Sequence, residues 1–362
     1  MKPGRFIGTT GPALNVEDFN ETSVPVTLST QFHVDTQFTT QDLALSLDMF
    51  SDRVLKPAVA AIANKIDRDG LSTAALNTYN IVGTAGTPPT GLITYLTGAA
   101  YLDSEGAPRD GRRSMIVEPF TSATIVDSLK GLFVPQEAIG EQYRKGLMGR
   151  DSGGMNWKLD QNVVSQTFGS WSSNTIAITL ASTSSAGVLT SGWASSSNVT
   201  LTASTASTLN AGDVFTIPGV YAVNPQNRQS YGKLRNFVVN STTTVATTGT
   251  TVNISPAIIV SGQFQNVQVT SYNSPNITAF NNTGVTSPQN IMMHRNAYTL
   301  AVADLELPDG VHFAGRASDK EVGLSMRVVR QYTINNDSIP TRLDVLYGWA
   351  PLYPELACRV AA

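Results

Sequence analysis

The sequence predicts a mixed α+β fold that is interrupted by a long all-β segment. Three patterns support this: apolar and polar side chains alternate over residues 24–38, apolar side chains recur at three- and four-residue steps over residues 40–67, and charged side chains nearly vanish over residues 166–286. The first pattern is typical of a half-exposed strand and the second of an amphipathic helix. The third is typical of a β domain whose short strands alternate with turns.

The N-terminal segment, residues 1–38, is predicted to be an extended β arm. At about 3.3 Å per residue, a strand over residues 24–38 would reach about 50 Å, against roughly 17–20 Å for an ordinary strand. Since a compact domain has little use for such a strand, we expect the arm to lie against a neighbouring subunit. The apolar side chains that we expect in this assembly interface are Phe6, Val26, Leu28, Phe32, Val34 and Phe38.

A long helix is predicted over residues 40–67, because its apolar side chains keep the helical spacing. Pro57 lies inside this pattern and lacks a backbone donor, so we expect the helix to bend near Arg53. A break near Ser51, which would give two helices, is the alternative. Gly70 is expected to end the helix.

Shorter helices and strands are predicted to alternate through the rest of the first half. Helices are expected at residues 91–104, 120–133 and 136–147, and a buried strand at residues 114–118. Such alternation is typical of an α/β domain. We therefore assign residues 39–165 to the first part of that domain.

The segment 166–286 differs sharply in composition from the residues around it. Its only charged residues are Asp213, Arg228, Lys233 and Arg235. Ser, Thr, Asn and Gly separate short β-branched runs, which predicts a barrel or sandwich. Strands are expected again at residues 322–334 and 341–350, around a polar turn. Residues 287–362 are therefore predicted to complete the α/β domain.

The composition argues against several classes of function. The formal net charge of the 362 residues is −3, so the sequence lacks the basic character of a tight nucleic-acid binder. No apolar run reaches the roughly 18 residues of a membrane span, and the N-terminus lacks the apolar core of a signal peptide. Cys358 is the only cysteine, so no intrachain disulfide can form. We expect a protein that is made in the cytoplasm and has no membrane partner.

No residue pattern predicts catalysis or a cofactor. The stretch DSGG at residues 151–154 matches the end of a serine-protease signature, but Arg150 stands where that signature has glycine. A nucleophilic serine also needs a base and an orienting acid, and the only histidine upstream is His33. A turn is the better interpretation, and a hydrolase built around Ser152 is the weakest hypothesis.

No metal site is predicted either. His294 and His312 have no carboxylate or thiol at ligand spacing, so we expect structural or surface histidines. Acidic side chains that we interpret as solvated, rather than as ligands, are Asp67, Asp69, Asp103, Glu105 and Asp110.

Three stretches of the chain carry a resemblance to a known family. They are QFHVDTQFTTQDLALSLDMFSDRVLKPAVAAIANKID at residues 31–67, GDVFTIPGVYAVNPQNRQSYGKLRNFVV at residues 212–239, and VVRQYTINNDSIPTRLDVLYGWAPLYPELACRV at residues 328–360. They are spread over nearly the whole chain and occur in the family's order. The chain resembles the major capsid (coat) proteins of tailed bacteriophages, in the P-twenty-two type that carries an inserted β domain.

This resemblance implies the Hong Kong 97 capsid fold. Residues 1–38 would then be the E-loop and residues 40–67 the spine helix. Residues 39–165 and 287–362 would form the peripheral and axial domains, and residues 166–286 the insertion domain. We expect this last domain to fold alone and to lie on the outside of the shell, because it offers almost no cations to DNA.

The same resemblance implies a major capsid protein rather than an enzyme. Such a protein self-assembles into an icosahedral shell around double-stranded DNA, without sequence-specific contact. Its partners would be copies of itself, in hexamers and pentamers, together with scaffolding and portal proteins. It would be assembled in the host cytoplasm and end in the virion capsid. The alternative is a phage tail or bacterial surface adhesin whose β domain binds glycans.

Overall fold

The computed structural model describes a defined part of the chain: residues 6, 8, 10–14, 16, 21–39, 54–129, 153–171, 173–180, 187–190, 192–270, 275–280, 283–319 and 323–362. The chain divides into two compact units. Unit 1 comprises Met1–Val24, Ala74–Ala297 and Pro351–Ala362, and unit 2 comprises Pro25–Thr73 and Tyr298–Ala350.

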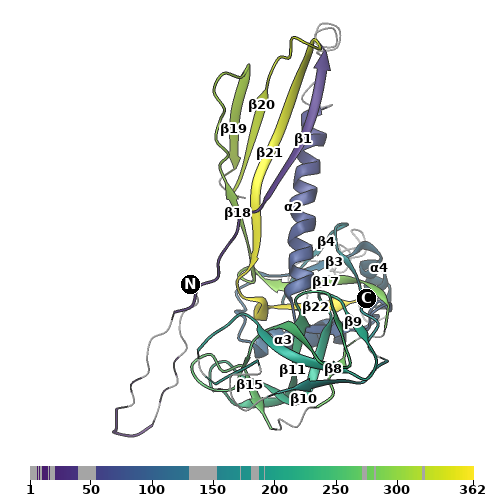
Figure 1. Cartoon of the computed structure of the whole chain (residues 1–362), viewed down its shortest axis with the longest axis vertical. Helices are drawn as coiled ribbons and strands as arrows, with labels where there is room; N and C mark the ends of the chain where they lie inside the picture. The colour runs from purple at the N-terminus through teal and green to yellow at the C-terminus, as the bar shows by residue number, and fades with distance from the viewer. Residues whose placement is uncertain are drawn as a thin grey trace. The chain divides into compact units, whose positions relative to one another are not determined.

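Unit 2 is built on a five-stranded sheet with the order β1-β21-β20-β19, in which β18 also pairs with β21 (Figure 1). The strands are β1 (Thr30–Thr39), β18 (Tyr298–Ala303), β19 (Phe313–Asp319), β20 (Leu324–Arg330) and β21 (Ser338–Pro351). The predicted strands at residues 322–334 and 341–350 are thus confirmed as β20 and β21, and the predicted polar turn connects them.

Strand β1 carries the alternation that the sequence predicts, but it begins at Thr30 rather than Val24. It runs antiparallel to β21, with Thr30 opposite Tyr347. Before β1, the chain passes close over β21: a Cβ on Gly348 would lie 2.0 Å from the carbonyl oxygen of Thr27. The strand of the arm is therefore ten residues long, and the residues before it approach β21 without joining the ladder.

Helix α2 (Lys56–Asn77) covers one face of this sheet. The core between them is formed by Ala58, Ile62 and Ile66 of the helix and Leu343, Val345 and Tyr347 of β21. The helical residues are spaced by four and the strand residues by two, so each set lies on a single face of its element. This is the packing that the two periodicities predict.

The expected helix end at Gly70 is wrong, because α2 continues to Asn77. A Cβ on Gly70 would lie 2.7 Å from Cζ2 of Trp349, which is too close for any side chain. The indole of Trp349 also donates a hydrogen bond from Nε1 to the carbonyl oxygen of Ile66, at 3.0 Å. Glycine is thus needed at this position for the approach of a strand residue and does not act as a helix stop.

Pro57 is the second residue of α2. Val54 and Leu55, directly before α2, are π-helical, so the helical geometry does not begin at Lys56, and a π-turn of this kind is one way in which a helix accommodates a local irregularity. The expected bend near Arg53 and the alternative break near Ser51 lie outside the described residues, as do the predicted helical residues 40–53.

Unit 1 contains a six-stranded sheet with the order β2-β22-β17-β3-β4, in which β5 also pairs with β17. Its strands are β2 (Ile81–Gly83), β3 (Arg113–Val117), β4 (Asn156–Leu159), β5 (Ser165–Thr167), β17 (Thr286–His294) and β22 (Ala357–Ala361). Helices α3 (Leu92–Ser104) and α4 (Pro119–Leu129) and the 3-10 helix η3 (Pro354–Leu356) accompany it. We call this sheet, apart from β5 and the first three residues of β17, together with α3 and α4, the α/β layer.

The α/β layer agrees with the predicted helix at residues 91–104 and the predicted strand at residues 114–118. Its core contains Tyr95 of α3, Ile125 of α4 and Trp157 of β4, and the Tyr95 and Trp157 rings lie 5.1 Å apart. The predicted helix at residues 136–147 lies outside the described part of the chain.

The central β segment, which we define as residues 165–288, forms a seven-stranded sheet with the order β15-β10-β11-β13-β8-β6, in which β16 pairs with β10. These strands are β6 (Ile176–Thr179), β8 (Ser197–Ala203), β10 (Val214–Val223), β11 (Ser230–Val239), β13 (Thr250–Ser255), β15 (Val267–Val269) and β16 (Thr278–Ala279). Two short pairs complete it: β9 (Ser207–Leu209) with β12 (Thr243–Val245), and β7 (Val188–Leu189) with β14 (Ile258–Ile259).

The central β segment has an apolar core of its own, to which Trp171, Phe215, Phe237 and Ile254 belong. Its two ends meet at the α/β layer, where β5 pairs with the first three residues of β17. Among the helices that the structure describes, none is both long and apolar enough to cross a membrane.

Candidate assembly surfaces

The six apolar side chains expected at the subunit interface divide into two groups. Phe32 and Val34 are partly buried against the core of unit 2, because β1 places them opposite Val345 and Leu343 of β21. The expectation that only another subunit could bury the apolar face of the arm is therefore wrong for these two residues. Phe38 is likewise half-buried.

The other three candidates present apolar surface to solvent. Phe6 is 55% exposed, and Val26 and Leu28 are also exposed. Two further residues of the same N-terminal part, Leu14 at 90% and Val16, expose even more of their side chains. No periodic pattern marks Leu14 and Val16 in the sequence, because Gly11 and Pro12 interrupt the alternation before them. Phe6, Leu14 and Val16 belong to unit 1, and Val26 and Leu28 belong to unit 2, so they form two separate groups of candidate interface residues.

A second apolar surface lies at one end of the sheet of unit 2. Ile334 is 80% exposed, and Tyr332 and Phe313 are exposed as well. Phe313 stands opposite Arg330, the last residue of β20, so it lies beside the turn that carries the other two. The hydroxyl of Tyr332 donates to Asp337 at 3.1 Å, which helps to fix this turn. The sequence pattern indicated only the polar residues of this turn.

A third set of exposed apolar side chains belongs to the α/β layer. Phe120, at the start of α4, is 81% exposed, and Ile93 and Leu96 of α3 and Leu159 of β4 are exposed too. Leu159 stands opposite Val117, the residue that ends β3 just before α4. Exposed apolar side chains of this size are the usual material of protein interfaces.

Ion pairs tie the arm strand to its own sheet. Arg342 of β21 donates to Asp35 at 2.9 Å, and His33 lies 3.0 Å from the same carboxylate. The hydrogen bond from Arg342 lowers the pKa of Asp35 below its ordinary value. In the next strand pair, Arg327 donates from Nε to the fully buried carboxylate of Asp344 at 2.9 Å. The polar face of β1 therefore has partners within the subunit.

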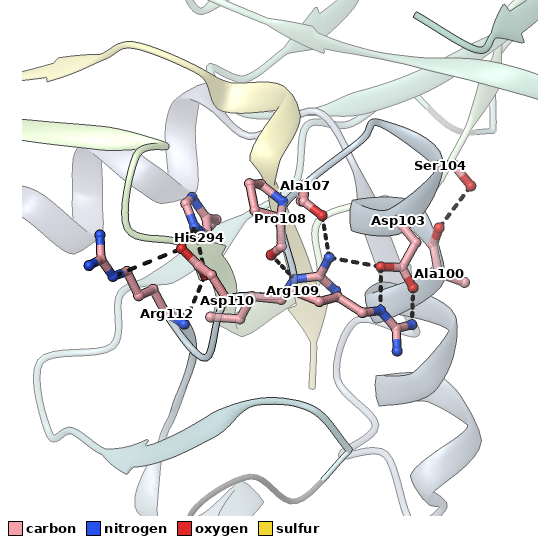
Figure 2. Close-up of polar contacts among 10 residues, drawn as sticks. Ala100, Asp103, Ser104, Ala107, Pro108, Arg109, Asp110, Arg112 and His294 are labelled. Atoms are coloured by element: carbon pink, nitrogen blue, oxygen red, sulfur yellow. Dashed lines mark hydrogen bonds and ion pairs between the residues drawn. The ribbon is translucent and has the colours of Figure 1, made fainter. Parts of the chain in front are cut away.

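Asp103 of α3 and Asp110 after it, both interpreted as solvated acids, have basic partners (Figure 2). Asp103 accepts from Arg109 and from the buried Arg113, and the latter also donates to the carbonyl oxygen of Pro108 at 2.9 Å. The hydrogen bond from Arg109 lowers the pKa of Asp103. Glu105 is buried and paired with Arg235. The expectation of a solvated acid is therefore wrong for Glu105, whose partner Arg235 comes from a distant strand, whereas Asp103 and Asp110 keep contact with solvent.

His294 is a buried structural histidine, as predicted, but it has a carboxylate partner (Figure 2). Its Nδ1 accepts from the backbone N–H of Asn296 at 3.3 Å, so its Nε2 carries the proton and donates to Asp110 at 3.2 Å. Arg112 lies 3.9 Å from the same acid. This arrangement fixes the loop after α3 and provides no free base.

The described residues offer little for chemistry. None of their His, Cys, Asp and Glu side chains gather in groups of three or more that could hold a metal ion. Burial raises the pKa of the Cys358 thiol, so this cysteine is inert in the core. Ser152, the weakly considered nucleophile, lies outside the described residues. The surfaces described above, rather than a pocket, are the candidate functional features.

The family model described as P22 coat protein, gene protein 5, matches residues 9–359 of the chain. Among solved structures, the chain is similar to that of Mycobacterium phage Che8, with 10% identity, a TM-score of 0.41 and coverage of 96% of this chain and 76% of that one. It is similar to the mature capsid of bacteriophage PhiM1, with 9% identity, a TM-score of 0.45 and coverage of 99% and 79%. It is also similar to the capsid of cyanophage P-SCSP1u, with 10% identity, a TM-score of 0.42 and coverage of 100% and 82%. No curated protein matches the chain in sequence.

Proposed function

The chain belongs to the P22 coat protein family and is a major capsid protein, and on this premise we propose how its parts build the shell. The single observation that carries the assignment is the family match over residues 9–359. It makes the protein a structural component, not an enzyme.

We assign the fold to the Hong Kong 97 type. Unit 2 would be the peripheral domain, with α2 as its spine helix, and the α/β layer would be the axial domain. The central β segment, approximately the predicted residues 166–286, would be the inserted domain. Its support is the pairing of β5 with β17, which brings the two ends of the segment together, and its own apolar core.

The shell would be held by many weak contacts between copies in hexamers and pentamers. Exposed apolar residues of the N-terminal segment, Phe6, Val26 and Leu28 among them, are the proposed interface. Full burial of a leucine-sized side chain contributes about 1.5–3 kcal/mol, so a single contact is weak and a closed shell sums many of them. Weak contacts also allow misplaced subunits to leave during assembly.

Scaffolding and portal proteins would be partners during assembly in the host cytoplasm, and double-stranded DNA would fill the finished virion capsid. We propose that the central β segment faces outward. Of its four charged residues, Asp213 and Arg235 are buried, so Arg228 and Lys233 are the cations left to meet DNA. Two cations give this segment little electrostatic attraction for a phosphate backbone, which favours the outward placement.

Sedimentation of the expressed protein tests this function. Shell assembly predicts a fast-sedimenting species far larger than one 38.5 kDa chain, and replacing Leu28 by Asp should shift the protein to slow fractions. Digestion of intact particles tests the outward placement: the loops of the central β segment should be cut while the shell stays closed. Cleavage only after the shells are opened would place the segment inside.

A further inference from the structure

Two buried arginines connect the central β segment with the α/β layer. One arginine belongs to each part, and each binds residues of the other part. Arg235 of β11 forms an ion pair with Glu105, the residue after α3, and both side chains are almost fully buried. Arg359 of β22, itself fully buried, donates to Oε1 of Gln166 and to the carbonyl oxygen of Gly212, both at 2.7 Å. Each part thus places one arginine in the other.

The surroundings of Arg235 belong to the α/β side of the contact. Besides Glu105, its guanidinium donates to the hydroxyl of Tyr79 at 2.9 Å and lies 4.8 Å from the centre of that ring. Burial alone would lower the pKa of Arg235, but the charges of Glu105 and its neighbours raise it. The arginine therefore stays charged in the interior, and its counter-charge comes from a different part of unit 1.

The hydrogen-bond partners of Arg359 belong to the central β segment: Gln166, near its beginning, and Gly212. Gln166 accepts from Arg359 and donates from Nε2 to the carbonyl oxygen of Ala211 at 3.1 Å, so its amide bridges the two parts. Gly212 has φ of 86° and leaves no room for a Cβ beside Gln166. The nearby carboxylate of Asp213 is buried and accepts from Nε1 of Trp171 at 2.8 Å.

An apolar contact joins the same two parts. Tyr79 and Ile81 of the α/β side pack in one buried cluster with Val214 and Val238 of the central β segment. Apolar contacts of this kind are tolerant of small rotations, whereas buried ion pairs and bidentate arginine contacts demand a fixed geometry. The arginines are therefore the elements that select one arrangement.

We propose that Arg235 and Arg359 are positioning residues that lock the central β segment onto the α/β layer in one orientation, and that the loss of either contact loosens the structure locally, around that arginine. The lock is a property of the single chain. If the test below refutes the lock, the assignment as a capsid protein is unaffected. If the protein does not assemble into shells, the proposal of the lock is unaffected.

Hydrogen–deuterium exchange of the full-length, unassembled chain tests the lock with Glu105→Gln, which removes the charge and keeps the shape. We expect exchange in β11 and at the end of α3 to accelerate by roughly a hundredfold, because the variant leaves a buried arginine without its counter-charge. Exchange in β8 should stay unchanged, because β8 pairs with β13 and β6 and not with β11. Asp35→Asn is the control, since it removes an exposed pair with Arg342 in unit 2 and should leave unit 1 unaffected.

Equal acceleration throughout unit 1, or no acceleration in β11 and α3, would overturn the proposal. The double variant Glu105→Met with Arg235→Met decides the matter if Glu105→Gln does not fold. An apolar pair removes both buried charges together, so the double variant should recover the slow exchange of β11. If the acceleration of exchange in the double variant instead equals the summed effects of Glu105→Met alone and Arg235→Met alone, the two residues act independently and the lock is overturned.

Discussion

Replacing Gly70 by alanine should destabilise the protein, although alanine is the better helix former. In an exposed helix the change would stabilise by about 0.8–1.0 kcal/mol. Here the new Cβ would lie 2.7 Å from Cζ2 and 2.8 Å from Cε2 of Trp349, so the indole must move. Overpacking of this kind costs about 1–3 kcal/mol, and the hydrogen bond from Trp349 to Ile66, worth about 0.5–1.5 kcal/mol, is strained or lost. The net effect is a loss of about 2 kcal/mol.

Urea denaturation followed by circular dichroism at the helix band measures this difference without relying on tryptophan fluorescence. The sharper form of the test uses Trp349→Phe as the background, because phenylalanine lacks the outer indole ring that meets residue 70. There, Gly70→Ala should stabilise by about 1 kcal/mol, the ordinary helix propensity difference. Stabilisation by Gly70→Ala in the unmodified protein would refute the reasoning, since it would mean that Trp349 is not held against α2.

Three further predictions concern the interface, the central β segment and pH. Leu28→Asp should leave a folded protein that forms no shells, whereas Phe32→Asp should unfold more readily because Phe32 packs inside unit 2; circular dichroism with sedimentation separates the two. Residues 165–288 expressed alone should melt cooperatively as a β domain, because their core is their own. The lowered pKa of Asp103 contributes stability above about pH 4 that is lost as pH falls through the folded pKa. Asp103→Asn should therefore flatten the fall in urea midpoint between neutral and acid pH.

Each of these has a result that contradicts it. Shells from Leu28→Asp would remove that residue from the interface, and an unfolded Leu28→Asp protein would place it in the subunit core. A non-cooperative melt of the isolated β segment would mean that it depends on the α/β layer for its fold. An unchanged acid dependence in Asp103→Asn would mean that the ion pairs with Arg109 and Arg113 contribute nothing to stability.

Local periodicity explains why parts of the fold could be predicted from the sequence. The spacing in α3 and the alternation in β21 are properties of neighbouring residues, and the structure places both elements close to the predicted bounds. Gly70 shows the limit of such reasoning. A glycine in a helical pattern predicts the end of the helix. Here the glycine is required by the close approach of Trp349, which is distant in sequence, and the helix continues past it.

The polar interior could not be predicted for the same reason. Glu105 and Arg235 are 130 residues apart, and no pattern in either stretch indicates the other. The alternation around Phe32 and Val34 predicted a strand with an apolar face, but not which surface would cover that face. That choice depends on the pairing of β1 with β21, which is a tertiary contact. Exposed residues such as Ile334 lie in turns, where periodicity gives no signal.

Electron microscopy of the purified, assembled protein tests the central claim most directly. We predict closed icosahedral shells built from hexamers and pentamers, with the density of the central β segment on the outer surface. Discrete trimers or fibres as the assembled species, with no closed shells, would contradict the account of this chain as the subunit of a capsid.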